Sequence, residues 1–213
     1  MPAHDVVIEG TFSVNSYTLT YKVDGDVYIT ETLSYGTTIT PLAAPEKEGY
    51  TFSGWSEIPA TMPAHDVVIE GTFSVNSYTV TFMIDGAVYE IKSVEYGSEI
   101  ELPTPPEKEG YIFSGWIDVP ATMPAEDIVV SGKFIVNGYS LTYKLDGVVY
   151  RTFNIAYGET ITPLAAPEKE GYTFSGWSDI PATMPAHDVV IEGTFSVNSY
   201  TLTYKIDGEV YRT

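Results

Sequence analysis

Apolar and polar residues alternate along several short segments of this chain. Residues 17–23 carry an apolar or aromatic side chain at every second position, and this period of two predicts a half-buried β-strand. Asp24-Gly25 follows, a pair typical of the type I′ hairpin turn, in which both central residues need a positive φ. We therefore expect a second, antiparallel strand from residue 27 to about residue 35.

The segments after this hairpin predict further short strands joined by loops. Residues 41–49 contain two prolines and a glycine, so they have room for at most one helical turn. Residues 50–55 and 67–75 are predicted strands, and the polar, proline-containing residues 56–66 are predicted to connect them. Val68 makes the second face of the last strand partly apolar, which favours a central place in a sheet. No segment has apolar residues at helical spacing, so we expect a mainly β unit.

The whole pattern returns every 61 residues without an insertion or deletion, as shown by the positions of Met1, Met62, Met123 and Met184 and of Trp55, Trp116 and Trp177. We expect full repeats at 17–77, 78–138 and 139–199. Residues 1–16 correspond to the C-terminal part of a preceding repeat, and residues 200–213 to the N-terminal hairpin of a following one. Only two residues separate successive predicted strands at each junction, which leaves little freedom there. The sequence therefore predicts a tandem array in the form of an elongated rod.

Aromatic residues supply much of the bulk that so small a unit can bury. The predicted structural core consists of Tyr21, Phe52, Trp55, Phe73, Phe82, Phe113, Trp116, Phe134, Tyr143, Phe174, Trp177 and Phe195. The predicted turn residues are Asp24, Gly25, Asp85, Gly86, Asp146 and Gly147. The alternative for the aromatic residues is an exposed platform of rings that binds carbohydrate.

Charge and composition narrow the classes of partner. The net charge is −19, with 10 Lys and Arg against 29 Asp and Glu, and such a surface repels nucleic-acid phosphates and anionic lipid. We therefore expect no nucleic-acid partner and no membrane contact by this segment. The chain has no cysteine, which excludes disulfides and thiol chemistry. It also has no apolar run long enough for a membrane-spanning helix, so an export signal or anchor is expected outside it.

Three groups of residues resemble reactive or metal-binding sites without completing one. His4, His65 and His187 each precede an aspartate, but the second repeat has Glu126 there and no repeat has a second histidine to complete a ligand set. Asp24-Gly25-Asp26 lacks the spacing of a calcium loop. An isopeptide bond from Lys47, Lys108 or Lys169 would require burial beside a carboxyl group, whereas each lies between two glutamates. We expect no catalytic residue, no metal site, no cofactor and no enzyme activity.

The segment Gly49-Tyr-Thr-Phe-Ser-Gly-Trp55, with its counterparts at Gly110–Trp116 and Gly171–Trp177, follows a proline-led turn in each repeat. With the Asp-Gly hairpin before it, each unit resembles the Listeria–Bacteroides repeat, also known as the internalin B-repeat type. The resemblance covers essentially the whole chain. It implies a β-grasp-like fold with a reduced helix, whose first and last strands lie side by side and parallel. It also implies a tandem segment of a large bacterial surface protein.

Two functions follow as expectations. The first is a non-catalytic spacer or stalk at the bacterial cell surface, outside the cell, which projects an adhesive region. In this case the partners are the neighbouring repeats of the same chain. The second is an adhesion module, in which the repeats bind a host glycoprotein or glycan multivalently. Unpaired strand edges at the two ends of the chain could also pair between chains.

Overall fold

The computed structural model describes residues 1–213 and contains strands, turns and extended segments but no helix. The chain separates into two compact units. The first comprises residues 1–83, 88–102 and 118–130, and the second comprises residues 84–87, 103–117 and 131–213. The division falls inside the middle predicted repeat, so each unit holds one complete outer repeat and its junction with the middle one.

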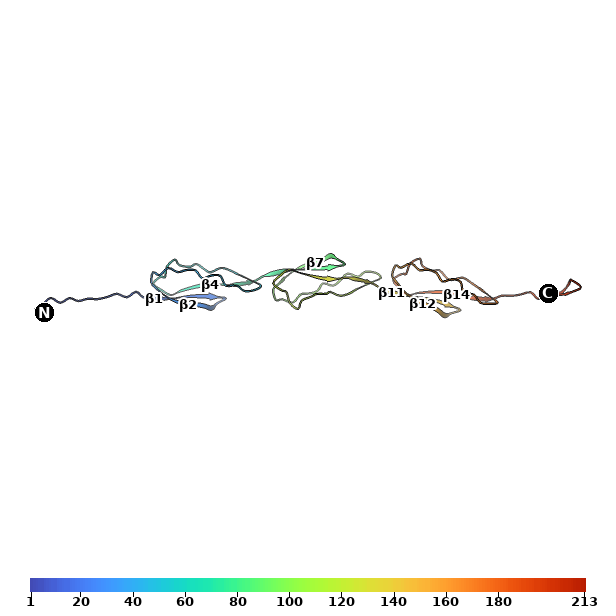
Figure 1. The fold of residues 1–213 in the computed structure, drawn as a ribbon, viewed down its shortest axis with the longest axis horizontal. Helices are drawn as coiled ribbons and strands as arrows, with labels where there is room; N and C mark the ends of the chain where they lie inside the picture. Colours follow the sequence, from blue (N-terminus) through green and yellow to red (C-terminus); the bar gives the residue numbers. More distant parts are fainter. The chain divides into compact units, whose positions relative to one another are not determined.

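The first repeat is built on a three-stranded sheet. Its strands are β1 (Ser16–Val23), β2 (Asp26–Ser34), β3 (Tyr50–Phe52), β4 (Val67–Gly71) and β5 (Phe73–Val75). The sheet has the order β2-β1-β4, and these three strands are labelled in Figure 1. β1 pairs with β2 in antiparallel fashion and with β4 in parallel, from Leu19 opposite Val67 to Val23 opposite Gly71. β3 and β5 form a separate antiparallel pair.

The same strands recur along the rest of the chain. The middle repeat has β6 (Ser77–Ile84), β7 (Ala87–Glu95), β8 (Tyr111–Phe113), β9 (Ile128–Gly132) and β10 (Phe134–Val136). The third has β11 (Gly138–Leu145), β12 (Val148–Ala156), β13 (Tyr172–Phe174), β14 (Val189–Gly193) and β15 (Phe195–Val197). Their three-stranded sheets have the orders β7-β6-β9 and β12-β11-β14. A last hairpin consists of β16 (Tyr204–Ile206) and β17 (Glu209–Arg212).

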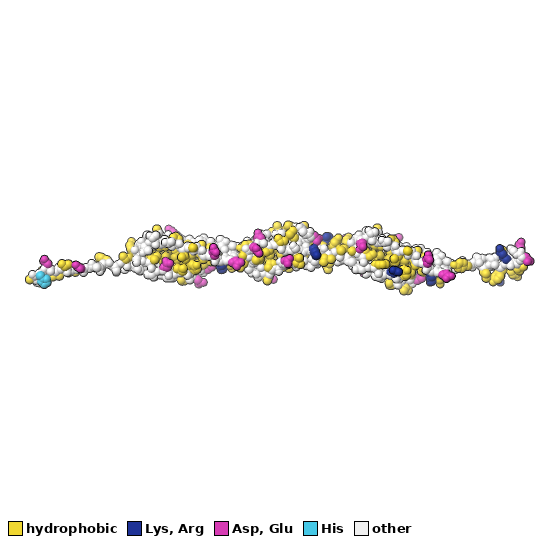
Figure 2. All heavy atoms as spheres, viewed as in Figure 1, with side chains coloured by type: hydrophobic (Ala, Val, Ile, Leu, Met, Phe, Trp, Pro, Cys, Tyr) yellow, Lys and Arg dark blue, Asp and Glu magenta, His cyan; other side chains and the backbone are white.

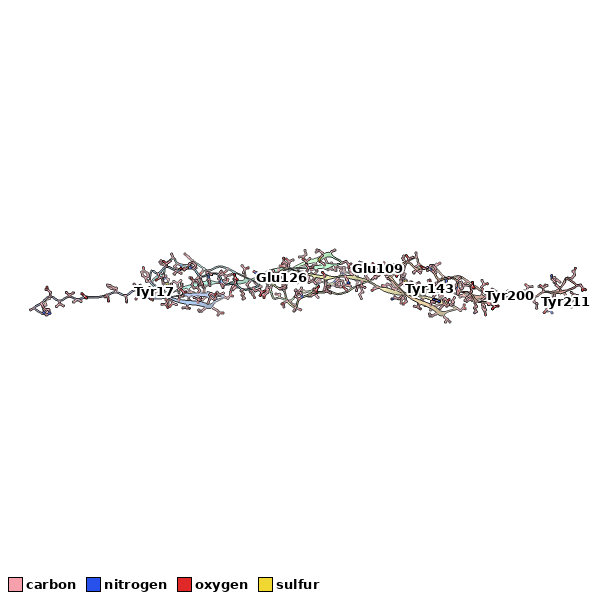
Figure 3. The ribbon with its side chains drawn as sticks, viewed as in Figure 1. Tyr17, Glu109, Glu126, Tyr143, Tyr200 and Tyr211 are labelled. Carbon is pink, nitrogen blue, oxygen red and sulfur yellow. The ribbon has the colours of Figure 1, made fainter.

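The core of each outer repeat lies on one face of its three-stranded sheet. Leu19 and Tyr21 from β1 and Val67 and Ile69 from β4 are buried there. The loops add further apolar side chains, and half-buried Trp55 packs against the group. The corresponding buried residues of the third repeat are Leu141, Tyr143, Ile161, Met184, Val189 and Ile191. Tyr143 lies among the strands of its repeat, as Figure 3 shows.

A second group of rings surrounds the β3–β5 pair. The Phe52 ring lies against the backbone of Gly71, where a Cβ atom would come within 2.2 Å of the ring. Phe52 is also in edge contact with Trp55, at 4.9 Å between centroids, and lies 5.2 Å from Phe73. Gly71 is therefore needed on β4, because a side chain there would displace the ring that joins the two sheets.

Two predictions about the last strand were wrong. Residues 67–75 do not form one strand, because Thr72 separates β4 from β5 and the two pieces pair with different partners. Val68 is 51% exposed, and β4 is an edge strand. The central place belongs to β1, which hydrogen-bonds to a strand on each side. The second face of β4 has nothing packed over it, so its apolar residue remains exposed.

The connector and the third strand also differ from expectation. β3 ends at Phe52, because Gly54 adopts a φ of +87° and redirects the chain so that Trp55 comes to lie on Tyr21. Within the connector, predicted to be polar, Met62 is fully buried. Two hydrogen bonds fix its backbone. The N–H of Met62 donates to Thr37 O, and the N–H of Gly36 donates to Met62 O. These bonds turn the methionine side chain into the core.

The surface is acidic and the chain has no helix that could cross a membrane. Acidic side chains occur at many places on the face shown in Figure 2, and basic ones are few. The fold thus consists of small β modules with their own apolar cores and a negatively charged exterior.

Candidate functional site

The parallel pairing of β1 with β4 recurs in the other repeats, and polar side chains bind to the backbone at both of its ends. Five residue pairs form the ladder in the first repeat, from Leu19 opposite Val67 to Val23 opposite Gly71. The third repeat has the same register between β11 and β14. Since β1 begins the repeat and β4 leads into its last strand, the ladder directly connects the two ends of the module.

A carboxylate closes the ladder where the two strands begin. Asp66 lies just before β4, and its Oδ1 accepts a hydrogen bond of 2.7 Å from the N–H of Thr18. The same contact recurs from Thr79 to Asp127 and from Ser140 to Asp188, at 2.7 and 2.8 Å. A carboxylate is a stronger acceptor than a neutral oxygen. Each of these aspartates therefore connects the start of the first strand to the start of the fourth.

A second carboxylate closes the opposite end. Asp24 and Gly25 have φ angles of +52° and +89°, as a type I′ turn requires. The N–H of Asp24 donates to Gly71 O at 3.0 Å, and its Oδ1 accepts from the N–H of Phe73 at 2.9 Å. The side-chain contact recurs from Phe134 to Asp85 and from Phe195 to Asp146. The hairpin turn therefore connects the sheet to the point where β4 gives way to β5.

The predicted lysines lie over aromatic rings. Lys47 Nζ is 3.9 Å from the centre of the Tyr50 ring and 5.4 Å from that of Phe73. Lys108 and Lys169 are placed in the same way, and Lys108 Nζ also lies 3.5 Å from Asp85 Oδ2. In the first repeat, Lys47 and its two rings line a shallow groove together with Pro45, Glu46, Glu48, Thr51 and Phe52. The arrangement is a cation–π contact at the surface.

The histidines are exposed and have local partners. Nδ1 of His65 and of His187 lies 2.8 and 2.9 Å from the carbonyl oxygen of the next residue, Asp66 and Asp188. His4 lies in the exposed segment before β1. No three His, Asp or Glu side chains gather in a way that could hold a metal ion. The aspartate that follows each of these two histidines, Asp66 or Asp188, is the residue that accepts a hydrogen bond from the first strand of its repeat.

The twelve aromatic residues proposed as the core fall into two groups. Tyr21, Phe82 and Tyr143 are fully buried. The other nine are half-buried and belong to the ring clusters around β3, β8 and β13. Each tryptophan also donates a hydrogen bond through Nε1 to a loop carbonyl oxygen, that of Leu42, Pro103 or Leu164.

Sequence reasoning missed two kinds of structural residue in the connector. Met62 and its counterparts Met123 and Met184 are at most 1% exposed, and Asp66 and its counterparts fasten the ladder. Both kinds of residue recur every 61 residues inside a loop, where an apolar methionine is unexpected. This recurrence was the one sequence feature that could have identified them. Composition alone gave no indication that the loop packs inward.

Comparison with known families agrees with the predicted resemblance. A family model described as the Listeria-Bacteroides repeat domain matches residues 17–63, 78–128 and 139–186, which is more than half of the chain. The three matches begin at equivalent positions of the three predicted repeats, on β1, β6 and β11.

The chain is also similar to parts of larger proteins. Two proteins of Evansella cellulosilytica, named as a membrane protein and a Gly-rich membrane protein, are 30% and 28% identical to it over 94% and 98% of its length. Internalin H of Listeria monocytogenes is 36% identical over 57% of the chain. The matched part covers only 34%, 28% and 26% of these three proteins. This chain therefore corresponds to about a third or less of each relative.

Proposed function

Because the chain belongs to the Listeria-Bacteroides repeat family, we propose that it is a non-catalytic spacer of a large bacterial cell-surface protein, which projects an adhesive region from the cell. The relatives named as membrane proteins and as an internalin support a place at the cell surface. Each repeat then adds a fixed length to the spacer, and its partners are the neighbouring repeats of the same chain.

The observation that carries this proposal is the parallel ladder between the first and fourth strands. Tension on a repeat acts at Ser16, where β1 begins, and at Val75, where β5 ends. It therefore pulls β1 and β4 in opposite directions along their common axis. In this shear geometry the five pairs from Leu19 to Val23 are strained together, whereas a hairpin pulled at its open end loses its bonds singly. This shear geometry helps a module that joins two tethered domains to stay folded under tension.

The aspartates at the two ends of the ladder reinforce it. Hydrogen bonds to charged groups contribute about 1.5–3 kcal/mol to stability. The bond between Thr18 and Asp66 is exposed, so we expect its contribution at the lower end of this range. Since Asp66 and Asp24 both bridge strands that shear would separate, their bonds must break before the ladder can slide.

Single-molecule force spectroscopy on the full chain tests the spacer proposal. We expect the complete repeats to unfold in separate events at forces well above those that open a hairpin from its ends. Asp66→Ala should lower the force of one event, while Asp66→Asn, whose amide oxygen can still accept, should retain most of it. Glu46→Ala removes the same charge from the exposed loop and serves as the control. Unfolding of the wild type at the low force that opens a hairpin would refute the spacer proposal.

The lysine–aromatic groove supports a second candidate, multivalent adhesion to a host glycoprotein or glycan. The same lysine, tyrosine and phenylalanine contacts recur in all three repeats. However, the lysine ammonium group covers a face of the tyrosine ring on which a sugar would stack. If the repeats are adhesive, the full chain should bind immobilised glycans and lose avidity on Lys47→Ala, Lys108→Ala and Lys169→Ala together. The spacer proposal predicts no binding by either form.

A further inference from the structure

Each junction between repeats contains a tyrosine ring lying on a glycine. Gly49, just before β3 of the first repeat, is buried, and its φ is +75°. A Cβ atom added to Gly49 would lie 2.2 Å from Cγ and Cδ1 of Tyr96, which belongs to the next repeat. Gly110 and Tyr157 repeat this contact with the same distances at the second junction. Each glycine lies in the same compact unit as its tyrosine.

Backbone and side-chain contacts surround this packing. The N–H of Asn76 donates to Gly49 O at 2.8 Å, and the N–H of Tyr96 donates to Asn76 O at 2.9 Å. The rings of Tyr50 and Tyr96 meet edge to face, with 6.0 Å between centroids. Thr51 Oγ1 donates to Asn76 Oδ1 at 2.6 Å, which holds Asn76, the single residue between β5 and β6, to β3. The second junction has the equivalent backbone bonds and a ring pair at 6.0 Å.

The third repeat provides an internal comparison. Gly171 occupies the same position as Gly49, with a φ of +78° and the same flanking residues Glu and Tyr. Nothing lies within 4 Å of the place where its Cβ would be. At the other end, Tyr35 corresponds to Tyr96 but is 59% exposed. The glycine and the tyrosine are therefore close-packed only where two repeats meet.

We propose that Tyr96 on Gly49, and Tyr157 on Gly110, form inter-repeat locks that hold each repeat in one orientation against the next. The ring atoms nearest to Gly49 include Cγ, the atom next to the tyrosine Cβ. A small movement of the ring tip cannot relieve a clash there, so an added methyl group at Gly49 must open the junction. The lock depends only on junction geometry, and it stands whether or not the repeats act as a spacer.

Glycine-to-alanine substitutions in the full chain measure the lock energetically. The cost of a Cβ at positive φ is common to Gly49→Ala and Gly171→Ala, so the difference between them isolates the tyrosine contact. Each substitution is read by hydrogen exchange at the amide that donates to the substituted residue, Asn76 for Gly49 and Asn198 for Gly171. Because only Gly49→Ala overpacks a tyrosine ring, we expect its amide to accelerate about tenfold more, which corresponds to about 1.4 kcal/mol. Equal acceleration of the two amides would overturn the proposal.

Distance measurement between spin labels tests orientation directly. The chain has no cysteine, so Thr32→Cys and Ser93→Cys place one label at equivalent exposed positions of the first two repeats. We expect a single narrow distance distribution that broadens in Tyr96→Ala and stays narrow in the control Tyr35→Ala. A second label pair inside the first repeat should be unchanged throughout, which shows that the repeat is still folded. A broad distribution in the wild type, or no broadening in Tyr96→Ala, would overturn the proposal.

Discussion

The hydroxyl group of Tyr21 offers a sharp test of the core, because the chain contains its own comparison. Tyr21 is 2% exposed, and no protein group forms a hydrogen bond with its hydroxyl. The same is true of Tyr143 in the third repeat, whereas the middle repeat has Phe82 at this position, also fully buried. Burying a hydroxyl without a partner costs about 1–3 kcal/mol by mutational data. The middle repeat lacks this cost.

Tyr21→Phe should therefore stabilise the first repeat. Part of the gain is offset because the phenylalanine leaves a small void where the oxygen was, so we expect about 1 kcal/mol, the lower end of the range. In native-state hydrogen exchange this corresponds to about fivefold slower exchange of the β1 amides. The β11 amides around Tyr143 should not change, and they serve as the internal control in the same molecule.

The reverse substitution completes the test. Phe82→Tyr should speed exchange in β6, because it adds a hydroxyl to an equivalent apolar site. The reasoning would be refuted if Tyr21→Phe accelerated exchange in β1 instead, since this would mean that the Tyr21 hydroxyl has a hydrogen-bonding partner. A coincident urea titration followed by tryptophan fluorescence would check that the fold is retained.

Three further substitutions probe the modules. Met62→Ala should destabilise the first repeat by about 2–5 kcal/mol, as for other buried methionines, and should lower the urea midpoint. A loss below about 0.5 kcal/mol, as at a surface position, would contradict its burial. Gly71→Ala should cost about 1–3 kcal/mol because its methyl group meets the Phe52 ring; unaltered thermal unfolding would show that the ring moves freely. Trp55→Phe should cost about 1 kcal/mol through the hydrogen bond to Leu42 O, and exchange of nearby loop amides would report it.

Local patterns were sufficient to predict the strands that start each repeat. The alternation in residues 17–23 and the Asp24-Gly25 pair correspond to β1, the turn and β2 almost residue for residue. These features depend on neighbours in sequence, since side chains alternate along one strand and φ is a property of one residue. The family match on three segments likewise follows from short motifs.

Features that depend on distant residues were not predictable in the same way. Just after the break at Thr72, the Phe73 amide donates to Asp24, which lies 49 residues earlier in the chain. The burial of Gly49 depends on Tyr96 in the following repeat. No window along the sequence contains both members of such a pair. Recurrence at a constant spacing was the only sign that these residues matter.

The separation between β1 and β4 along the chain has a consequence for biosynthesis. Thr18 bonds to Asp66, 48 residues later. A repeat that emerges gradually can therefore form its hairpin early but cannot close its sheet until nearly the whole unit is available. During this interval the open side of β1 can accept any strand with the right sequence. β4 and β14 are both Val-Val-Ile-Glu-Gly, while β9 between them is Ile-Val-Val-Ser-Gly. The divergent middle repeat thus keeps identical closing strands apart, and it lowers the chance that adjacent modules exchange strands as they emerge.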